Sequence, residues 1–123
     1  MAGDVVISKD KTWISGGVAF SAIVRGAKSY LERSDVNLAR TVYEPTEQGL
    51  ELIDLTNLNS EDFRKVYAAL ALHFHLSKDS GQLGCLEPKY FATTLSHFES
   101  LLKELASDVR AKADTELPVL HKR

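Results

Sequence analysis

Hydrophobic and polar residues follow two different periods in the first part of the chain. Residues 5–8 and 12–15 are rich in β-branched and aromatic side chains, as half-buried strands tend to be, and they flank a polar turn. After the glycine pair at 16–17, apolar residues recur at the three- and four-residue spacing of one helix face. The pattern predicts two strands followed by a helix over about residues 18–33, with a strand over residues 18–24 as the alternative.

The next apolar segments resemble a second pair of strands. β-branched and aromatic residues return over residues 36–43, and a turn at 44–49 that contains proline and glycine separates them from the apolar segment 50–55. We therefore expect a β-hairpin. Within its second strand, Glu51 and Asp54 would point to opposite faces of the sheet.

A helix start is clearly marked around Asn59. The Asn59 side chain can accept a hydrogen bond from an amide of the first turn, and Asp62 lies near the positive end of the expected helix. Leu58 and Phe63 occupy the two positions of a hydrophobic staple. The apolar stripe that follows predicts a helix that ends in the segment 77–84, which contains two glycines.

A last helix is predicted from Pro88 to about residue 110, because the fixed φ of proline suits the first helical position. Its apolar residues alternate spacings of four and three: Phe91, Leu95, Phe98, Leu102, Leu105 and Val109. Such a heptad seam either packs on the sheet and the preceding helix or forms a homodimeric coiled coil through residues 91–109. The seam is shorter than the roughly three to four heptads that argue for a coiled coil.

Together these elements predict an α+β fold, in which a small, mostly antiparallel sheet packs against three amphipathic helices in the order ββ-α-ββ-α-α. The 123 residues leave room for one domain. We expect a single globular domain over residues 1–110 and a polar C-terminal tail over residues 111–123, where helical periodicity is lost.

Composition narrows the possible functions. The chain has 15 basic and 17 acidic residues and a net charge of −2, which argues against direct binding of nucleic acid. Cys85 is the single cysteine, so no intrachain disulfide can form, and a reducing cytoplasm fits best. No apolar run approaches the roughly 18 residues of a membrane span, and the first residues lack a signal-peptide pattern, so we expect no membrane partner.

No reactive constellation is recognisable along the chain. His73 and His75 form an H-x-H pair, but on a helix they point about 200° apart and cannot share a metal ion. Cys85 and the glycine turn at 15–17 lack the neighbours that a thiol nucleophile or a phosphate loop needs. We therefore expect no catalytic residue, no metal and no cofactor, and do not expect an enzyme.

The most unusual feature is a segment, from residue 44 to residue 62, that contains acidic residues and no lysine or arginine. Its six acidic residues are Glu44, Glu47, Glu51, Asp54, Glu61 and Asp62. Elsewhere both signs of charge are interspersed. If the six acids share one surface, that surface would steer and hold a basic partner. The alternative is a structural role in a turn and at a helix start, and Arg64 and Lys65 follow immediately.

These observations favour a small cytosolic protein-binding module that captures and neutralises a basic protein through its acidic residues. One concrete case is an immunity or antitoxin protein that acts against a nucleic-acid-cleaving toxin. A first alternative is a small enzyme or ligand-binding protein, whose pocket near Asp54 would also gather a histidine and Tyr43 or Arg40. A second is a structural protein that dimerises through its last helix.

Overall fold

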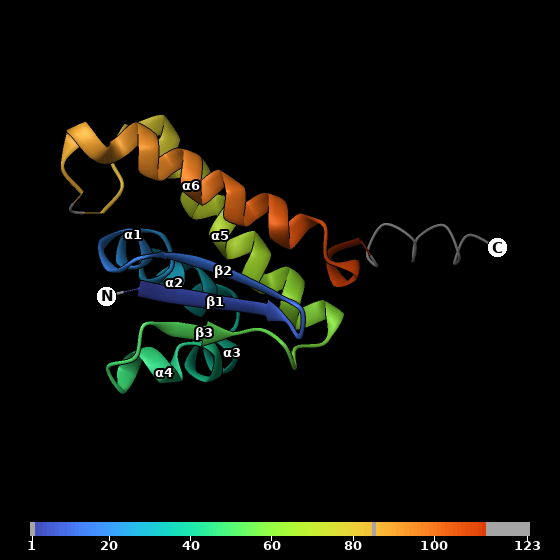
Figure 1. Cartoon of the computed structure of the whole chain (residues 1–123). Coiled ribbons are helices and arrows are strands. Elements are labelled where there is room, and N and C mark those ends of the chain that lie inside the picture. The colour runs from blue at the N-terminus through green and yellow to red at the C-terminus, as the bar shows by residue number, and fades with distance from the viewer. Residues whose placement is uncertain (1, 85, 113–123) are drawn as a thin grey trace.

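The computed structural model describes residues 2–84 and 86–112 and contains a three-stranded mixed sheet with helices packed against it (Figure 1). Its strands are β1 (Ala2–Ser8), β2 (Lys11–Gly16) and β3 (Leu52–Asp54), in the order β2-β1-β3. β1 pairs with β2 antiparallel and with β3 parallel. The α+β class and the first two strands are confirmed, whereas the expectation of a mostly antiparallel sheet requires correction.

One face of the sheet is buried and the other is open. Val5 lies opposite Trp13 on β2 and Ile53 on β3, and all three side chains are buried. Because successive side chains in a strand point to opposite faces, their neighbours turn outward. Ile14 is 59% exposed, and Asp54 is also exposed. The helices therefore cover one face only.

The segment after β2 is helical, as predicted, but it is divided into three pieces. These are α1 (Gly17–Ile23), the short 3-10 helix η1 (Arg25–Ala27) and α2 (Lys28–Ser34). The alternative of a strand over residues 18–24 is thus wrong. At Gly26, η1 approaches another helix so closely that an added Cβ would lie 2.5 Å from His73 Nε2. Close packing explains the glycine.

The strand expected over residues 36–43 is wrong, because α3 (Val36–Val42) occupies this segment. Asp35 caps the helix, its Oδ1 accepting a hydrogen bond from Leu38 N at 3.1 Å. Leu38, Ala39 and Val42 are buried on one face. The β-branched composition pointed to a strand, but the aspartate cap and the helical spacing of the buried residues determine the structure.

The predicted hairpin is also absent among the described residues. Residues of the expected turn form the short helix α4 (Glu44–Glu47), with Pro45 in its first turn. The strand that follows, β3, lies beside β1 and not beside residues 36–43. The chain therefore contributes one strand here where the sequence predicted two, and the expected order ββ-α-ββ-α-α does not hold.

The helix expected after Asn59 is confirmed as α5 (Ser60–Ser80). Asn59 Oδ1 accepts a hydrogen bond from Asp62 N at 2.8 Å, and the helix ends at Gly81, whose φ is +75°. Such a left-handed backbone favours glycine. α5 packs against α2, η1 and the last helix, so it links the elements that cover the sheet (Figure 1).

The last helix, α6 (Pro88–Ala106), starts where the sequence predicts but ends earlier. Its buried positions are Thr94, Phe98, Leu101 and Leu105. The predicted seam is therefore correct in part: Phe98 and Leu105 are buried, Leu101 was missed, and Val109 is 76% exposed. α6 packs on α5, which agrees with the prediction that the seam packs on the preceding helix. Dimerisation through this helix stays a prediction.

Arg110 fastens the chain after α6 to the end of the sheet. Its guanidinium donates to the carbonyl oxygens of Ile7, Leu55 and Leu58 at 2.7, 2.6 and 3.0 Å. It also pairs with Asp108 at 2.9 Å and lies over the Phe63 ring at 4.1 Å. We call this arrangement the Arg110 clamp. Most of the tail predicted over residues 111–123 lies outside the described residues, as does Cys85.

Candidate partner-binding surface

The six acidic residues named above fall into two groups, at the two ends of β3. Glu44 and Glu47 belong to α4, and Glu51 precedes β3 directly. Asp54 ends β3, and Glu61 and Asp62 lie in the first turn of α5. Figure 1 shows α4 and the start of α5 on opposite sides of this short strand. The six therefore follow one edge of the sheet and do not form one compact cluster.

Two of the acids have cationic neighbours from the same chain. Lys28 on α2 forms an ion pair with Glu47, and this contact holds the pKa of the Glu47 carboxyl below its usual value. Lys65 Nζ lies 3.7 Å from Glu61 and 3.0 Å from Asp35. The hydrogen bond with Asp35 raises the pKa of Lys65. Internal cations thus offset part of the negative charge that the sequence suggested.

Two further acids take part in local structure. Asp54 Oδ1 accepts a hydrogen bond from Thr56 N at 2.9 Å, which closes the turn after β3. Asp62 is half-buried in the first turn of α5, where the helix dipole favours a negative charge. These are the structural roles that the sequence left open as an alternative. Glu44 is exposed on α4.

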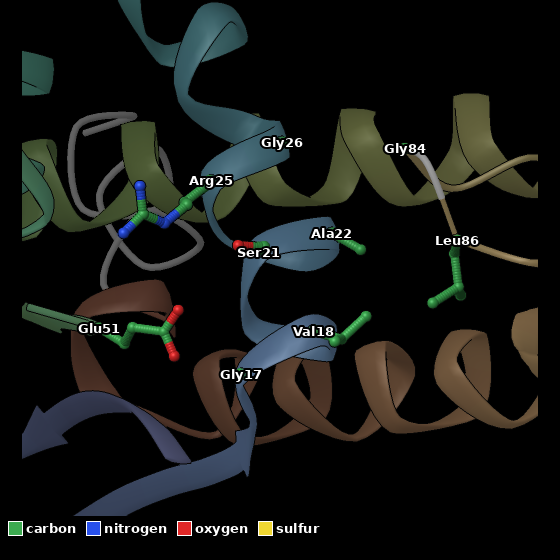
Figure 2. Close-up of a pocket in the computed structure, with 9 residues that line it drawn as sticks. All are labelled: Gly17, Val18, Ser21, Ala22, Arg25, Gly26, Glu51, Gly84 and Leu86. Atoms are coloured by element: carbon green, nitrogen blue, oxygen red, sulfur yellow. The ribbon is translucent and has the colours of Figure 1, made fainter. Parts of the chain in front are cut away.

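Glu51 differs from the other five. Its Oε1 atom is shielded from solvent, and no group among the described residues forms a hydrogen bond with it. The carboxylate points into a cavity of about 730 Å³ that α1 and η1 line on one side (Figure 2). Most of the wall is small or apolar, and Arg25 and Ser21 are its other polar side chains. The complete lining is Gly17, Val18, Ser21, Ala22, Arg25, Gly26, Glu51, Gly84 and Leu86.

A second hollow, of about 420 Å³, continues from the first along the start of α6. Val18 and Leu86 line both. The remaining lining of the second hollow is Ala19, Tyr90, Thr93 and Thr94. Val18 is 71% exposed and Tyr90 is 50% exposed, so apolar surface is open to solvent here. We call the two hollows together the α1–α6 groove; Glu51 lies at one end and Tyr90 at the other.

The residues of the enzyme alternative do not converge. Tyr43 and Arg40 line a separate hollow with Lys28, Glu32, Val36 and Glu47, and Asp54 is not part of it. The Tyr43 hydroxyl donates to Val24 O at 2.7 Å, and burial raises the pKa of this phenol. His73 Nε2 lies 2.8 Å from Ala22 O. Tyr43 and His73 are thus buried and used in packing, whereas Arg40 and Asp54 are exposed.

Within the described residues, no group of three or more His, Cys, Asp and Glu side chains could hold a metal ion. His73 is buried between the rings of Tyr30 and Phe98, whereas His75 is exposed. The two histidines thus belong to different environments on α5. No helix in the described part of the chain is long and apolar enough to cross a membrane.

Comparisons with known proteins give one informative result. No family model matches the sequence, and no curated protein matches it. Among solved structures, the chain is similar to the immunity protein in a complex described as "CdiA-CT toxin from Burkholderia pseudomallei E479 in complex with cognate CdiI immunity protein". The two share 24% sequence identity and a TM-score of 0.72, over 88% of this chain and 97% of the other. They therefore share a fold.

Sequence reasoning did not find the α1–α6 groove. It selected the apolar residues that follow one helix face and passed over those outside it. Val18 lies outside the stripe predicted for the first helix, and Tyr90 lies outside the seam predicted for the last one. The sequence did contain a signal for such a groove, namely apolar residues that lie outside the predicted core faces. Only the fold brings the two together across the groove.

Proposed function

We propose that this protein is an immunity protein, which binds a toxin domain and thereby neutralises it. The observation that carries the proposal is the shared fold with the CdiI immunity protein, which spans 97% of that chain. The likeness is not confined to a common motif such as a helix pair, because it includes the sheet and the helices around it.

The proposed mode of action is occlusion, and it requires no catalysis by this chain. A protein that covers the working surface of its partner needs shape and charge complementarity, and charge complementarity also speeds association. We infer that the partner is basic where it meets the acidic residues along the edge of β3. Glu44 and Glu51 are the best candidates, since no ion pair involves them in the described part of the chain.

We further propose that the protein acts in the cytoplasm as a binder and not as an enzyme. A single cysteine is compatible with a reducing compartment. The net charge of −2 supports a protein partner more than nucleic acid. The buried side chains of Tyr43 and His73, which a catalytic site could have used, have hydrogen-bond partners within the chain.

A growth assay tests the proposal. Cells that produce a toxin domain on induction are given this chain or an empty vector. The toxin domains are the CdiA-CT toxin of B. pseudomallei E479 and any toxin domain encoded beside the gene for this chain. We expect growth to be restored against at least one of them, together with co-purification of the two proteins. Continued growth arrest with every toxin domain, and no complex, would contradict the proposal.

Charge reversal tests the acidic residues separately. Glu44→Lys and Glu51→Lys together should weaken the complex and reduce its dependence on salt, because two favourable charges become unfavourable. A Glu99→Lys, Asp79→Lys variant has the same net charge, with both substitutions at exposed helix positions away from β3. Equal affinity of the two variants would show that the acidic residues along β3 are not part of the interface, and it would not contradict the immunity function.

A further inference from the structure

Glu51 is held in place by its backbone, while its Oε1 has no hydrogen-bond partner among residues 2–84 and 86–112. Asp4 N donates to Glu51 O at 2.9 Å, and the next residue begins β3, which pairs with β1. The strand thus fixes where the Glu51 side chain starts, and Figure 2 shows its carboxylate directed into the cavity. A buried oxygen without a hydrogen-bond donor is costly in an isolated protein. A donor from outside the chain would remove that cost.

Arg25 is the cation that lines the same cavity, but it does not fulfil this role. No salt bridge or hydrogen bond joins Arg25 to Glu51 in the part of the chain that the structure describes. The Arg25 charge instead contributes, after Lys28, to the lowered pKa of Glu47. Arg25 is exposed at the rim, so a partner can approach Glu51 from the groove.

The rest of the α1–α6 groove offers apolar contact. Gly17, Ala19 and Ala22 leave room beside α1, and Val18 and Leu86 form the surface shared by the two hollows. Interface cores combine such apolar contact with a few polar groups that fix orientation. A basic side chain has both parts, because its aliphatic stem packs on apolar surface and its head donates hydrogen bonds.

We propose that the α1–α6 groove is the toxin-binding site and that it receives an arginine or lysine of the toxin. The cationic head donates to Glu51 Oε1, and the stem and an adjacent apolar side chain lie against Val18 and Leu86. The negative charge of Glu51, whose Oε1 has no hydrogen-bond partner in the described part of the chain, selects this occupant. The inference rests on the proposed immunity function, since it names where and with what chemistry the toxin is held.

Two substitutions test the site, each with a matched control. Glu51→Gln removes the charge but keeps the shape, and Val18→Asp places a charge on the apolar wall at an exposed position near the start of α1. The controls are Glu99→Gln on α6 and Val36→Asp at the start of α3, both exposed and outside the groove. Circular dichroism and urea unfolding establish that each variant is folded.

The measurement is the Kd of each variant for the toxin domain that the wild-type chain neutralises, by isothermal titration calorimetry. We expect Glu51→Gln and Val18→Asp each to raise the Kd at least tenfold, and the two controls to change it less than threefold. Weakening by Glu51→Gln should persist in high salt, where long-range charge effects are screened.

Each other outcome overturns the inference in a recognisable way. If the wild type binds the toxin and all four variants bind equally well, the groove is not the site, although the immunity function stands. If the wild type binds no toxin, both proposals fail. If light scattering shows a wild-type dimer that Val18→Asp dissociates while toxin affinity is unchanged, a second copy occupies the groove and the toxin does not.

Discussion

Two charged side chains at opposite ends of β1 and β3 have opposite surroundings. Arg110 contacts carbonyl oxygens after β3 and near the end of β1, its charge is paired with Asp108, and its side chain is only 14% exposed. Glu51 precedes β3, and its Oε1 has no hydrogen-bond partner in the described part of the chain. Arg110 therefore has hydrogen-bond and ion-pair partners within the chain, whereas the described residues supply none to Glu51 Oε1.

The difference separates what holds the fold together from what is open to a partner. A buried charge stabilises a protein only when its hydrogen bonds are made, and the Arg110 clamp meets this condition. An unsatisfied polar atom is one of the features that need an explanation in a native protein. If the Arg110 clamp is structural and the Glu51 end is functional, substitutions at the two ends should affect different measurements.

The largest effect is expected at Arg110. Arg110→Ala removes the guanidinium that donates to three carbonyl oxygens and pairs with Asp108, so the free energy of unfolding should fall by about 3–5 kcal/mol. Arg110→Lys keeps the charge but lacks the planar guanidinium, so its free energy of unfolding should lie between those of the wild type and Arg110→Ala. Urea denaturation measures both. A loss below about 1 kcal/mol for Arg110→Ala would show that the clamp is not structural.

A smaller loss is expected at Gly26, which lies under the groove. Gly26→Ser places a Cβ 2.5 Å from His73 Nε2, so His73 or η1 must shift. Such overpacking typically costs about 1–3 kcal/mol. Gly16→Ser is the control, because a Cβ there meets nothing within 4 Å and serine is a good residue at this N-cap. Equal unfolding midpoints for the two variants would contradict the close contact.

The Arg110 clamp also predicts a dependence on pH. The hydrogen bond and charge of Arg110 hold the pKa of Asp108 below its usual value of 3.8. A carboxyl with a lowered folded-state pKa contributes stability above its unfolded value, and this contribution is lost as the pH falls through the folded-state value. Asp108→Asn should therefore be less stable than the wild type at pH 7, and the difference should shrink below pH 3.8. A difference that does not change over this range would argue against the pair.

The smallest effect on stability is expected at Glu51. Glu51→Gln replaces a carboxylate whose Oε1 has no donor among the described residues with an amide of the same shape, so the free energy of unfolding should change by less than about 0.5 kcal/mol. Glu51→Gln should therefore bind the toxin weakly and keep full stability. Arg110→Ala should lose stability and keep full toxin affinity per folded molecule. Marked destabilisation by Glu51→Gln would mean that Glu51 belongs to the structural part of the molecule.

The elements that local signals specify were predictable from the sequence. The first two strands, the helix start at Asn59 and the start of α6 at Pro88 all agree with the structure. The strand predicted over residues 36–43 was wrong because β-branched residues outweighed the Asp35 cap in the interpretation. The parallel pairing of β3 with β1 depends on contacts between segments far apart in the sequence, which no local pattern contains.

The candidate site was predictable only in part. The acidic segment drew attention to Glu51, yet the sequence could not show that Lys28 pairs with Glu47 or that Asp54 closes a turn. The apolar side of the groove joins α1 to the start of α6, and this proximity arises when both helices pack in the same molecule. Partners of charged residues and the walls of a groove are properties of the fold.

Amide hydrogen exchange of the chain, alone and with the toxin domain it neutralises, tests most directly whether the Glu51 end is the binding end. Binding should slow exchange in α1 and η1, over residues 17–27, and at the start of α6, over residues 86–94. Exchange around the Arg110 clamp, at residues 55–58 and 107–112, should change little. Slower exchange at the clamp with no change in the groove would contradict the account.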